Sequence, residues 1–242
     1  MGARMRLGLV IGAAITVLGA QAAPAQFSGK FELAPPGCES TGQCTLTYDL
    51  LFKDPQGLEW QADAKNKTDG ASIPSWAQPI VGKPFDSLFV KAAAIHDHYC
   101  DRHVRTWRAT HRVFYDALIV SGVEIAKAKV MYYAVYLGGP KWVKLISGKP
   151  CGSGMACANH FQTGIGGPTT QLGSGDHFLK RAGQYDEPGF SEELAEVHKI
   201  LAANPTSLTL EDLETRAKKR RPNDFYYKND SEITLGTQLE IK

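Results

Sequence analysis

The stretch AAAIHDHYC, residues 92–100, places three ionisable side chains in a row inside an otherwise small and apolar sequence. The apolar residues before and within it recur at the 3.6-residue spacing of a helix with one buried face. Asp86 or Ser87 can cap this helix, and the pattern ends near residues 102–103. The residues on the predicted buried face are Leu88, Phe89, Ala92, Ala93, His96 and Cys100.

His96, Asp97 and His98 cannot all point the same way on such a helix. Side chains one residue apart diverge by about 100°, so the two histidines point in roughly opposite directions. His96 shares the buried face, Asp97 flanks it, and His98 points toward solvent or a lateral neighbour. An acid beside this histidine favours a functional His-Asp pair, and the alternative is a packed histidine hydrogen-bonded to a carbonyl.

The surrounding sequence predicts strands before this helix and further helices after it. Residues 27–33 and 44–54 are strand-like, and a Pro-Gln-Gly turn joins the second to residues 58–68 as a hairpin. A second helix follows the cap Thr106 and ends at Gly122. A third runs from Val123 to about Leu137, and the short links predict antiparallel neighbours. Residues 26–147 therefore predict an α+β unit, an N-terminal β-hairpin followed by a three-helix core.

The rest of the chain changes character twice. Residues 148–190 are rich in glycine, serine and threonine and predict a long, disulfide-pinned loop. Residues 191–242 predict a C-terminal pair of amphipathic helices, capped by Ser191 and Thr209, followed by a mostly extended tail.

The chain has five cysteines, and two close pairs among them suit short-loop disulfides in an oxidising compartment. Four cysteines alone allow three pairings, so the sequence leaves other connectivities open. We predict the pairs Cys38–Cys44 and Cys151–Cys157, which leave Cys100 free and buried.

Residues 1–25 have the layout of a secretory signal peptide. Arg4 and Arg6 precede a fourteen-residue apolar run, and Ala23 and Ala25 are spaced as a cleavage site. The run is shorter than the ~20 residues that span a bilayer, which favours export over an anchoring helix. We expect a periplasmic or secreted protein.

The charge balance argues against a nucleic-acid partner. The full chain carries a formal net charge of +2, and cleavage after residue 25 would remove two arginines and no acid. The mature protein would then be neutral overall, without the basic excess that attracts nucleic acid. Nothing in the sequence specifies an oligomeric state.

The His-Asp pair can do two chemical jobs at once. His96 can accept a proton from water, while the oxygens of Asp97 can ligate a hard cation that polarises a carbonyl. The segment TDGAS upstream, with Asp69 and the flexible Gly70, is a candidate turn for further oxygen ligands. The sequence therefore predicts a site for a hard divalent cation with Asp69 and Asp97 as ligands.

Several motifs resemble those of a family of short bacterial and phage proteins of unknown function. They are TDGASIP at residues 68–74, a Gly-x-Pro-Phe step at 82–85, the His-Asp helix, Arg108 and RVFYDAL at 112–118. The resemblance covers roughly residues 46–139.

The same turn and helix are more distantly similar to secreted bacterial and fungal phospholipases of the A-two type. That resemblance implies that His96 is the general base, that Asp97 ligates calcium, and that Asp69 with neighbouring carbonyls completes the shell. Both families tend to place an aspartate on the next helix to orient the histidine, and here His111 stands at that position. An imidazole can orient His96, but it cannot stabilise an imidazolium as a carboxylate does.

His111 also opens an alternative metal site. His96, Cys100 and His103 follow i, i+4, i+7 spacing on one helix face, and His111 comes from the antiparallel neighbour. Two or three of these side chains could bind Zn²⁺ or another borderline metal.

Two functional hypotheses follow. The first is an exported hydrolase in which His96, Asp97 and His111 act on an ester or amide of a membrane lipid or other envelope component. The second is a non-catalytic periplasmic or secreted structural or binding protein, in which the His-Asp pair joins turn and helix.

Overall fold

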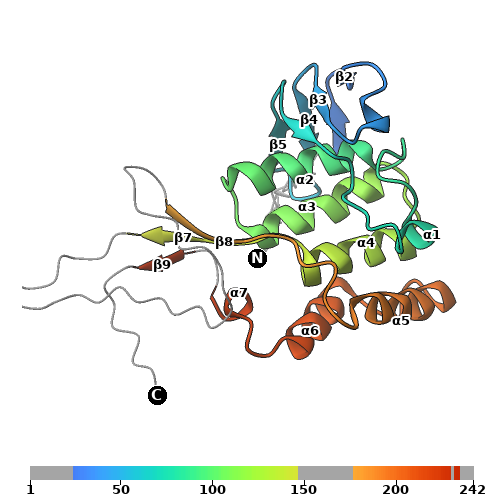
Figure 1. Ribbon diagram of the computed structural model, residues 1–242, viewed down its shortest axis with the longest axis vertical. Helices are drawn as coiled ribbons and strands as arrows, with labels where there is room; N and C mark the ends of the chain where they lie inside the picture. The colour runs from blue at the N-terminus through green and yellow to red at the C-terminus, as the bar shows by residue number, and fades with distance from the viewer. Residues whose placement is uncertain (1–23, 147–176, 230–231, 235–242) are drawn as a thin grey trace, which may run out of the picture.

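The computed structural model describes residues 24–146, 177–229 and 232–234, which form an α+β protein (Figure 1). Short strands cover one side of helix α2, and α3, α4 and the pair α5–α6 follow in successive layers. The N-terminal elements are β1 (Gln26–Ser28), β2 (Leu33–Ala34), the short 3-10 helix η1 (Cys38–Ser40), β3 (Cys44–Leu46), β4 (Leu50–Lys53), β5 (Glu59–Ala62), β6 (Lys67–Thr68) and α1 (Gln78–Val81). The later elements are α2 (Val90–Arg102), α3 (Trp107–Val120), α4 (Ile125–Gly138), β7 (Lys141–Ile146), β8 (His177–Arg181), α5 (Phe190–Ala203), α6 (Leu210–Arg220), α7 (Phe225–Lys228) and β9 (Glu232–Thr234).

The N-terminal strands form two small antiparallel sheets, ordered β1-β4-β5 and β2-β3-β6. The predicted hairpin is confirmed, since β4 pairs with β5 across the Pro-Gln-Gly turn. The single strand predicted over 44–54 is wrong, because β3 and β4 belong to different sheets. The chain bends between them, where the Asp49 carboxylate accepts a hydrogen bond from the Ala64 amide at 2.7 Å.

Asp54 organises the turn of the hairpin. Its buried carboxylate accepts hydrogen bonds from the amides of Gln56 (3.0 Å) and Leu58 (2.8 Å) and from the Trp60 indole (2.9 Å). Trp60 then packs edge-on against Tyr99 of α2, with ring centroids 4.7 Å apart. The turn thus fixes the sheet against the helix that carries the His-Asp pair.

The three helices of the core lie close to where the sequence predicts them. Thr106 caps α3 by accepting a hydrogen bond from the Ala109 amide, and Gly122 adopts the left-handed conformation that lets the chain reverse into α4. α2 begins at Val90 rather than at the predicted 86–87, because Asp86 caps a preceding turn through the Leu88 amide.

α4 is buried nearly all round, which explains its tyrosine-rich sequence. Tyr132 and Tyr133 are almost fully buried and donate hydrogen bonds to Glu214 of α6 (2.7 Å) and Glu193 of α5 (2.6 Å). These bonds dock the predicted C-terminal helical pair onto the core. Thr209 caps α6 as predicted, but Gly189 rather than Ser191 precedes the first turn of α5.

The third sheet, ordered β8-β7-β9, was not predicted. β7 follows α4 directly and pairs antiparallel with β8, which lies inside the segment predicted to be a long loop. β9 pairs parallel with β7 and belongs to the predicted extended tail. Apolar and polar residues alternate only weakly in these segments. Strand formation here therefore depends on pairing between segments that are distant in the chain.

The described residues test only part of the cysteine predictions. The Cys38–Cys44 disulfide is confirmed, and Cys100 is free but only half-buried. Cys151–Cys157, most of the glycine-rich loop and most of the predicted signal peptide lie outside the described residues. Among the helices of the described segments, none combines the length and apolar character needed to cross a membrane.

We predict that Asp54→Ala destabilises the fold by about 2–4 kcal/mol, because it removes three hydrogen bonds to a carboxylate and leaves a buried indole N–H unpaired. Chemical denaturation followed by tryptophan fluorescence measures the change. Gln56→Ala, which alters an exposed side chain of the same turn, is the matched control. Equal stability of the two variants would show that Asp54 does not anchor the hairpin.

Candidate functional site

A cleft of about 810 Å³ lies between the β2-β3-β6 sheet and the helical core. Its volume is in the range of small-molecule sites. Residues from both sides of the cleft are polar, including Thr68 and Asp69 of the TDGAS turn and His96, Asp97 and Cys100 of α2. The structure therefore brings together on one cleft the turn and the helix that the sequence singled out.

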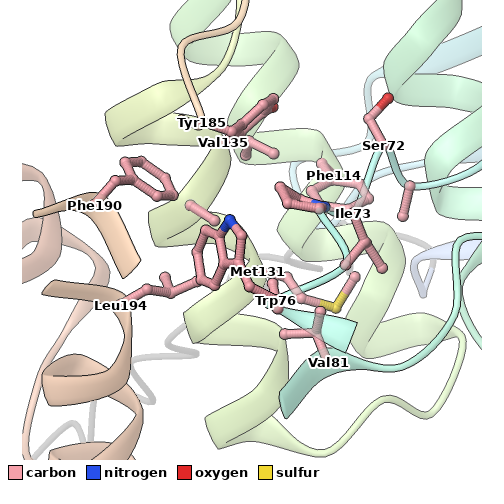
Figure 2. A pocket seen from close by; sticks show the side chains of 14 residues that line it. Ser72, Ile73, Trp76, Val81, Phe114, Met131, Val135, Tyr185, Phe190 and Leu194 are labelled. Carbon is pink, nitrogen blue, oxygen red and sulfur yellow. The ribbon is translucent and has the colours of Figure 1, made fainter. Parts of the chain in front are cut away.

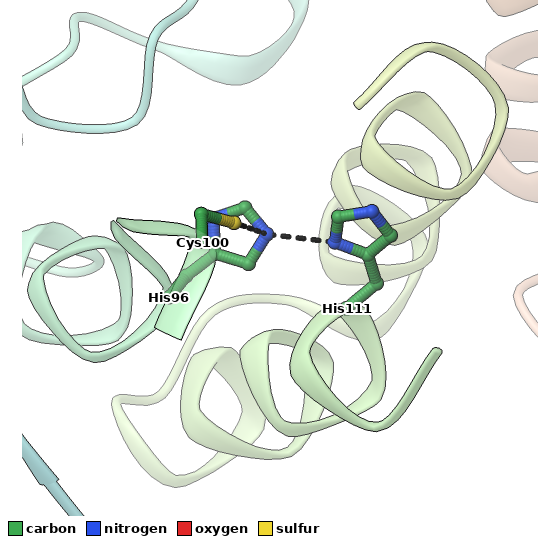
Figure 3. A group of neighbouring side chains, drawn as sticks. All are labelled: His96, Cys100 and His111. Atoms are coloured by element: carbon green, nitrogen blue, oxygen red, sulfur yellow. Dashed lines mark hydrogen bonds between the residues drawn. The ribbon is translucent and has the colours of Figure 1, made fainter. Parts of the chain in front are cut away.

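His96 lies at the base of this cleft. Its side chain is 9% exposed, and its ring packs against Phe114 with centroids 4.9 Å apart. The His96 Nε2 atom lies 2.8 Å from Nδ1 of His111 on α3, and Figure 3 shows the two rings meeting between the helices. The predicted inward direction of His96 is confirmed.

The hydrogen bonds of His111 fix which nitrogen carries each proton. His111 Nε2 lies 3.0 Å from the Pro140 carbonyl, which can only accept, so Nε2 carries the hydrogen. Burial lowers the pKa of His111 well below its usual value, and the nearby His96 and Lys141 act in the same direction. The His111 ring is therefore neutral, and its Nδ1 accepts a hydrogen bond from His96 Nε2.

The consequence is that Nδ1 is the basic nitrogen of neutral His96. This atom lies 3.8 Å from Oδ1 of Asp97. The sequence showed no aspartate to orient His96. In the structure the Pro140 carbonyl orients His111, and His111 in turn orients His96. A backbone carbonyl cannot be recognised in a sequence, because every residue has one. The glycine before Pro140 is nevertheless a sequence signal for this contact.

Gly139 is that signal. A Cβ at this position would lie 3.1 Å from two atoms of the His111 ring and would collide with the Val135 carbonyl oxygen. Only glycine lets the backbone approach the imidazole this closely. The glycine that ends the third helix in sequence therefore also makes room for His111.

Asp97 joins the helix to the TDGAS turn. Its Oδ2 accepts a 2.6 Å hydrogen bond from the Thr68 hydroxyl, and that hydroxyl accepts from the Gly70 amide at 3.1 Å. Burial raises the pKa of Asp97, while the neighbouring His96 and Thr68 lower it. Gly70 has a φ of 79°, and a Cβ there would collide with the Pro84 carbonyl.

Asp69 lies on the same cleft but is exposed. Its Oδ1 accepts a 2.7 Å hydrogen bond from the Ser72 hydroxyl. Asp69 is close enough to raise the pKa of Asp97 through its negative charge. Two carboxylates of the predicted calcium site thus share one cleft, each with one oxygen bound to a hydroxyl.

A small apolar pocket adjoins the cleft (Figure 2). It lies between the segment after the TDGAS turn, α4 and the start of α5, with Trp76 and Phe190 among its walls. The residues that line both spaces are Ala71, Ser72, Phe114, Val135 and Tyr185. A ligand with a polar and an apolar part could therefore contact both.

Cys100 is close to His96 but is a poor nucleophile. Its Sγ lies 3.6 Å from His96 Nε2. Burial raises the pKa of the thiol well above its usual value, and the charges of Asp97 and Asp101 raise it further. A catalytic cysteine needs the opposite shift, toward the thiolate.

The remaining histidines of this region have other partners. His98 is buried, with its Nε2 3.9 Å from an Asp63 carboxylate oxygen, which confirms a lateral neighbour rather than solvent. His103 ends α2 in the left-handed conformation and packs between Trp142 and Phe178. Among the described residues, the cluster of possible metal ligands on the cleft contains His96, Cys100 and His111 but not His103.

Comparison with known proteins places the chain in a family. Residues 44–135, from β3 into α4, match the family described as a protein of unknown function, DUF1353. The uncharacterized protein y4iH of Sinorhizobium fredii (strain NBRC 101917 / NGR234) is 38% identical over 200 residues, which cover 81% of this chain and 78% of that protein. The chain belongs to the DUF1353 family.

A second relative from the same strain, the uncharacterized protein y4jT, is 40% identical over 127 residues. That match covers 51% of this chain and 38% of the relative. No solved structure shows significant similarity to the chain. The predicted resemblance to a family of unknown function is confirmed, and the DUF1353 segment contains the TDGAS turn, His96, Asp97, Cys100 and His111.

We predict that His103 makes stability depend on pH. Burial lowers its pKa to about 4 in the folded protein, and the charge of Lys180 contributes, so the unfolded chain binds a proton first as the pH falls below about 6.5. Stability should therefore fall between pH 7 and pH 5. His103→Asn, which tolerates the left-handed conformation, should reduce that fall by roughly 0.5–1 kcal/mol, a value discounted for partial exposure.

Urea denaturation of both proteins at pH 7 and pH 5 measures the difference. His198→Asn, on α5, is a control that removes another half-buried histidine but leaves the His103 contacts with Trp142 and Phe178 in place. An identical pH dependence in His103→Asn and the parent protein would contradict the assignment.

Proposed function

We propose that the protein is a hydrolase in which His96 is the general base, acting on an ester or amide bond of a cell-envelope lipid. The observation that carries this proposal is the chain of hydrogen bonds from His96 through His111 to the Pro140 carbonyl. It holds the His96 ring in one tautomer and leaves Nδ1 as the basic atom at the cleft.

In this mechanism His96 Nδ1 accepts a proton from a water molecule in the cleft as the water attacks the carbonyl carbon. The imidazolium then returns the proton to the alcohol or amine that leaves as its bond to that carbon breaks. The imidazolium that forms needs a negative partner, which neutral His111 cannot provide. Asp97, with its Oδ1 3.8 Å from Nδ1, is that partner. His111 positions the ring, and Asp97 stabilises the charge.

Asp69 and Asp97 would hold the divalent cation. Their carboxylates are the hard oxygen ligands that Ca²⁺ prefers, and both line the cleft beside the TDGAS turn. A bound cation would polarise the carbonyl of the substrate and stabilise the developing oxyanion.

The apolar pocket is small, at about 30 Å³, and meets the polar cleft along a shared wall that includes Phe114 and Val135. It has room for a small apolar group beside the bond presented to His96, while the rest of a lipid-like substrate would lie in the larger cleft. The predicted signal peptide would place the protein where envelope lipids are accessible.

We predict that His96→Gln lowers hydrolytic turnover at least roughly 10²-fold, the usual contribution of a general base. The glutamine amide can still donate to His111 Nδ1, so the fold should be retained while the basic nitrogen is lost. The measurement is a screen of phospholipid vesicles and short esters and amides, followed by kinetics on the best substrate.

His98→Gln is the matched control, because His98 is buried on the same helix but does not line the cleft. Its turnover should equal that of the parent protein. If His96→Gln hydrolyses the substrate as fast as the parent, His96 is not the base.

A second candidate function rests on the Thr68–Asp97 hydrogen bond. That bond ties β6 to α2, as expected for a structural pair in a non-catalytic envelope or binding protein. In this case Asp97→Ala would mainly destabilise the fold, and divalent cations would have no effect.

Calcium separates the two candidates. If Asp69 and Asp97 hold Ca²⁺, the ion should raise the melting temperature of the parent protein, since a ligand that binds only the folded state stabilises it. Asp69→Asn should abolish the increase, and Asp63→Asn, an acid that does not line the cleft, should preserve it. Calorimetry with and without Ca²⁺ makes the measurement, and a melting temperature indifferent to Ca²⁺ would favour the structural role.

A further inference from the structure

We propose that His96, His111 and Cys100 form a binding site for a borderline transition-metal ion of the Zn²⁺ type, distinct from the calcium ligands. The three ligand atoms are His96 Nε2, His111 Nδ1 and Cys100 Sγ, which all lie within 4.8 Å of one another (Figure 3). Two imidazoles and a thiolate are a ligand set that selects Zn²⁺ and similar ions over Ca²⁺, and the Cys100 thiol would release its proton to solvent as the ion binds.

Binding such an ion requires the Cys100 side chain and the two imidazole rings to move. Metal–ligand bonds of about 2.05 Å to nitrogen and 2.3 Å to sulfur put tetrahedral ligands roughly 3.3 Å (N to N) and 3.6 Å (N to S) apart. The Cys100 Sγ atom lies 3.6 Å from His96 Nε2 but also 3.8 Å from Nδ1, so it sits beside the ring, and the Cys100 side chain must rotate to bring Sγ to the open side of Nε2. The His96 Nε2 to His111 Nδ1 distance is 2.8 Å, so these rings would separate by about half an ångström.

The outer nitrogens of both rings face acceptors, as they do in metal-binding histidines. His111 Nε2 donates to the Pro140 carbonyl, and His96 Nδ1 faces the Asp97 carboxylate at 3.8 Å. Metal ligands are typically oriented by such second partners, which fix the tautomer. If both outer nitrogens carry hydrogen, the inner pair presents two lone pairs, and a cation between them removes their repulsion.

The site is reachable and leaves one coordination position free. His96 and Cys100 line the open cleft, while His111 closes the site from below. Three protein ligands leave a fourth tetrahedral position free for water or a ligand. The other cluster of metal-ligand residue types among the described residues, Cys38, Glu39 and Cys44, contains a disulfide and offers no thiolate.

Metal binding has a consequence for His96 that rests on the proposed function. The ion occupies Nε2, so Nδ1 must carry the hydrogen that faces Asp97. The ring then has no lone pair with which to accept a proton from water. Zn²⁺ should therefore switch off the general base, whereas Ca²⁺ bound by the carboxylates should not.

Cobalt(II) titration tests the metal site directly. The full-length protein is purified without a histidine tag in a Cys151→Ser/Cys157→Ser background, which removes the cysteines outside the described residues. Co²⁺ should produce the near-ultraviolet charge-transfer band of a cobalt–thiolate bond, together with visible bands of tetrahedral intensity. Stoichiometric Zn²⁺ should displace the ion and abolish both.

Variants identify the ligands. Cys100→Ser should lose the charge-transfer band, and His111→Gln should weaken Co²⁺ binding at least roughly 10-fold, while His103→Asn should bind like the parent. A parent protein without the charge-transfer band, or a band that survives in Cys100→Ser, would overturn the site. These readouts do not depend on activity, so they stand even if no hydrolysis is found.

Inhibition is measured separately on the best substrate. Zn²⁺ should reduce turnover with the same midpoint at which it displaces Co²⁺, and Cys100→Ser should need at least roughly 10-fold more Zn²⁺. Zn²⁺ binding without loss of turnover, or with increased turnover, would overturn the switching role while leaving the metal site intact.

Discussion

The hydrogen bond from His111 to the Pro140 carbonyl is the constraint on which the site depends. It connects α3 to the short link between α4 and β7, and it fixes the protonation of two buried rings in turn. Because the carbonyl can only accept, His111 must accept from His96, and His96 must present Nδ1 to the cleft. Gly139 permits this contact by leaving space for the imidazole. A single backbone oxygen thereby defines the chemistry of a side chain on a third element, α2.

A second tie holds the opposite side of the cleft. Thr68 links the last N-terminal strand to Asp97, and Gly70 lets the turn pass closely beside Pro84. The β layer is itself fixed against α2 by the packing of Trp60 on Tyr99. The cleft is therefore bounded by two rigid attachments, one from the sheet side to Asp97 and one from the helix side to His96. His96 and Asp97, which are neighbours on α2, are therefore held by different parts of the fold.

The sequence predicts the local features of this arrangement and misses the non-local ones. Helical spacing and the Thr106 cap locate the helices, because local hydrogen bonds and a single buried face determine them. The separation of His96 from His98 follows from helix geometry alone. The third sheet was missed because β7, β8 and β9 pair across long distances in the chain, and no local pattern encodes that pairing. The Pro140 partner was missed because a backbone carbonyl is present at every residue, so only the fold can single it out.

The presence of His111 at a position where a carboxylate was expected changes the electrostatics of the site. A buried aspartate at that position would place a negative charge below His96, and a neutral imidazole does not. The only negative charge adjacent to His96 among the described contacts is then Asp97, whose pKa is raised by burial. Any positive charge on His96, whether from a proton or from a metal ion, favours the ionised form of Asp97. Ionised Asp97 in turn strengthens its hydrogen bond from Thr68, since a charged acceptor binds a hydroxyl more tightly than a neutral one does. The state of His96 is thus coupled through one carboxylate to the turn that forms the other wall of the cleft.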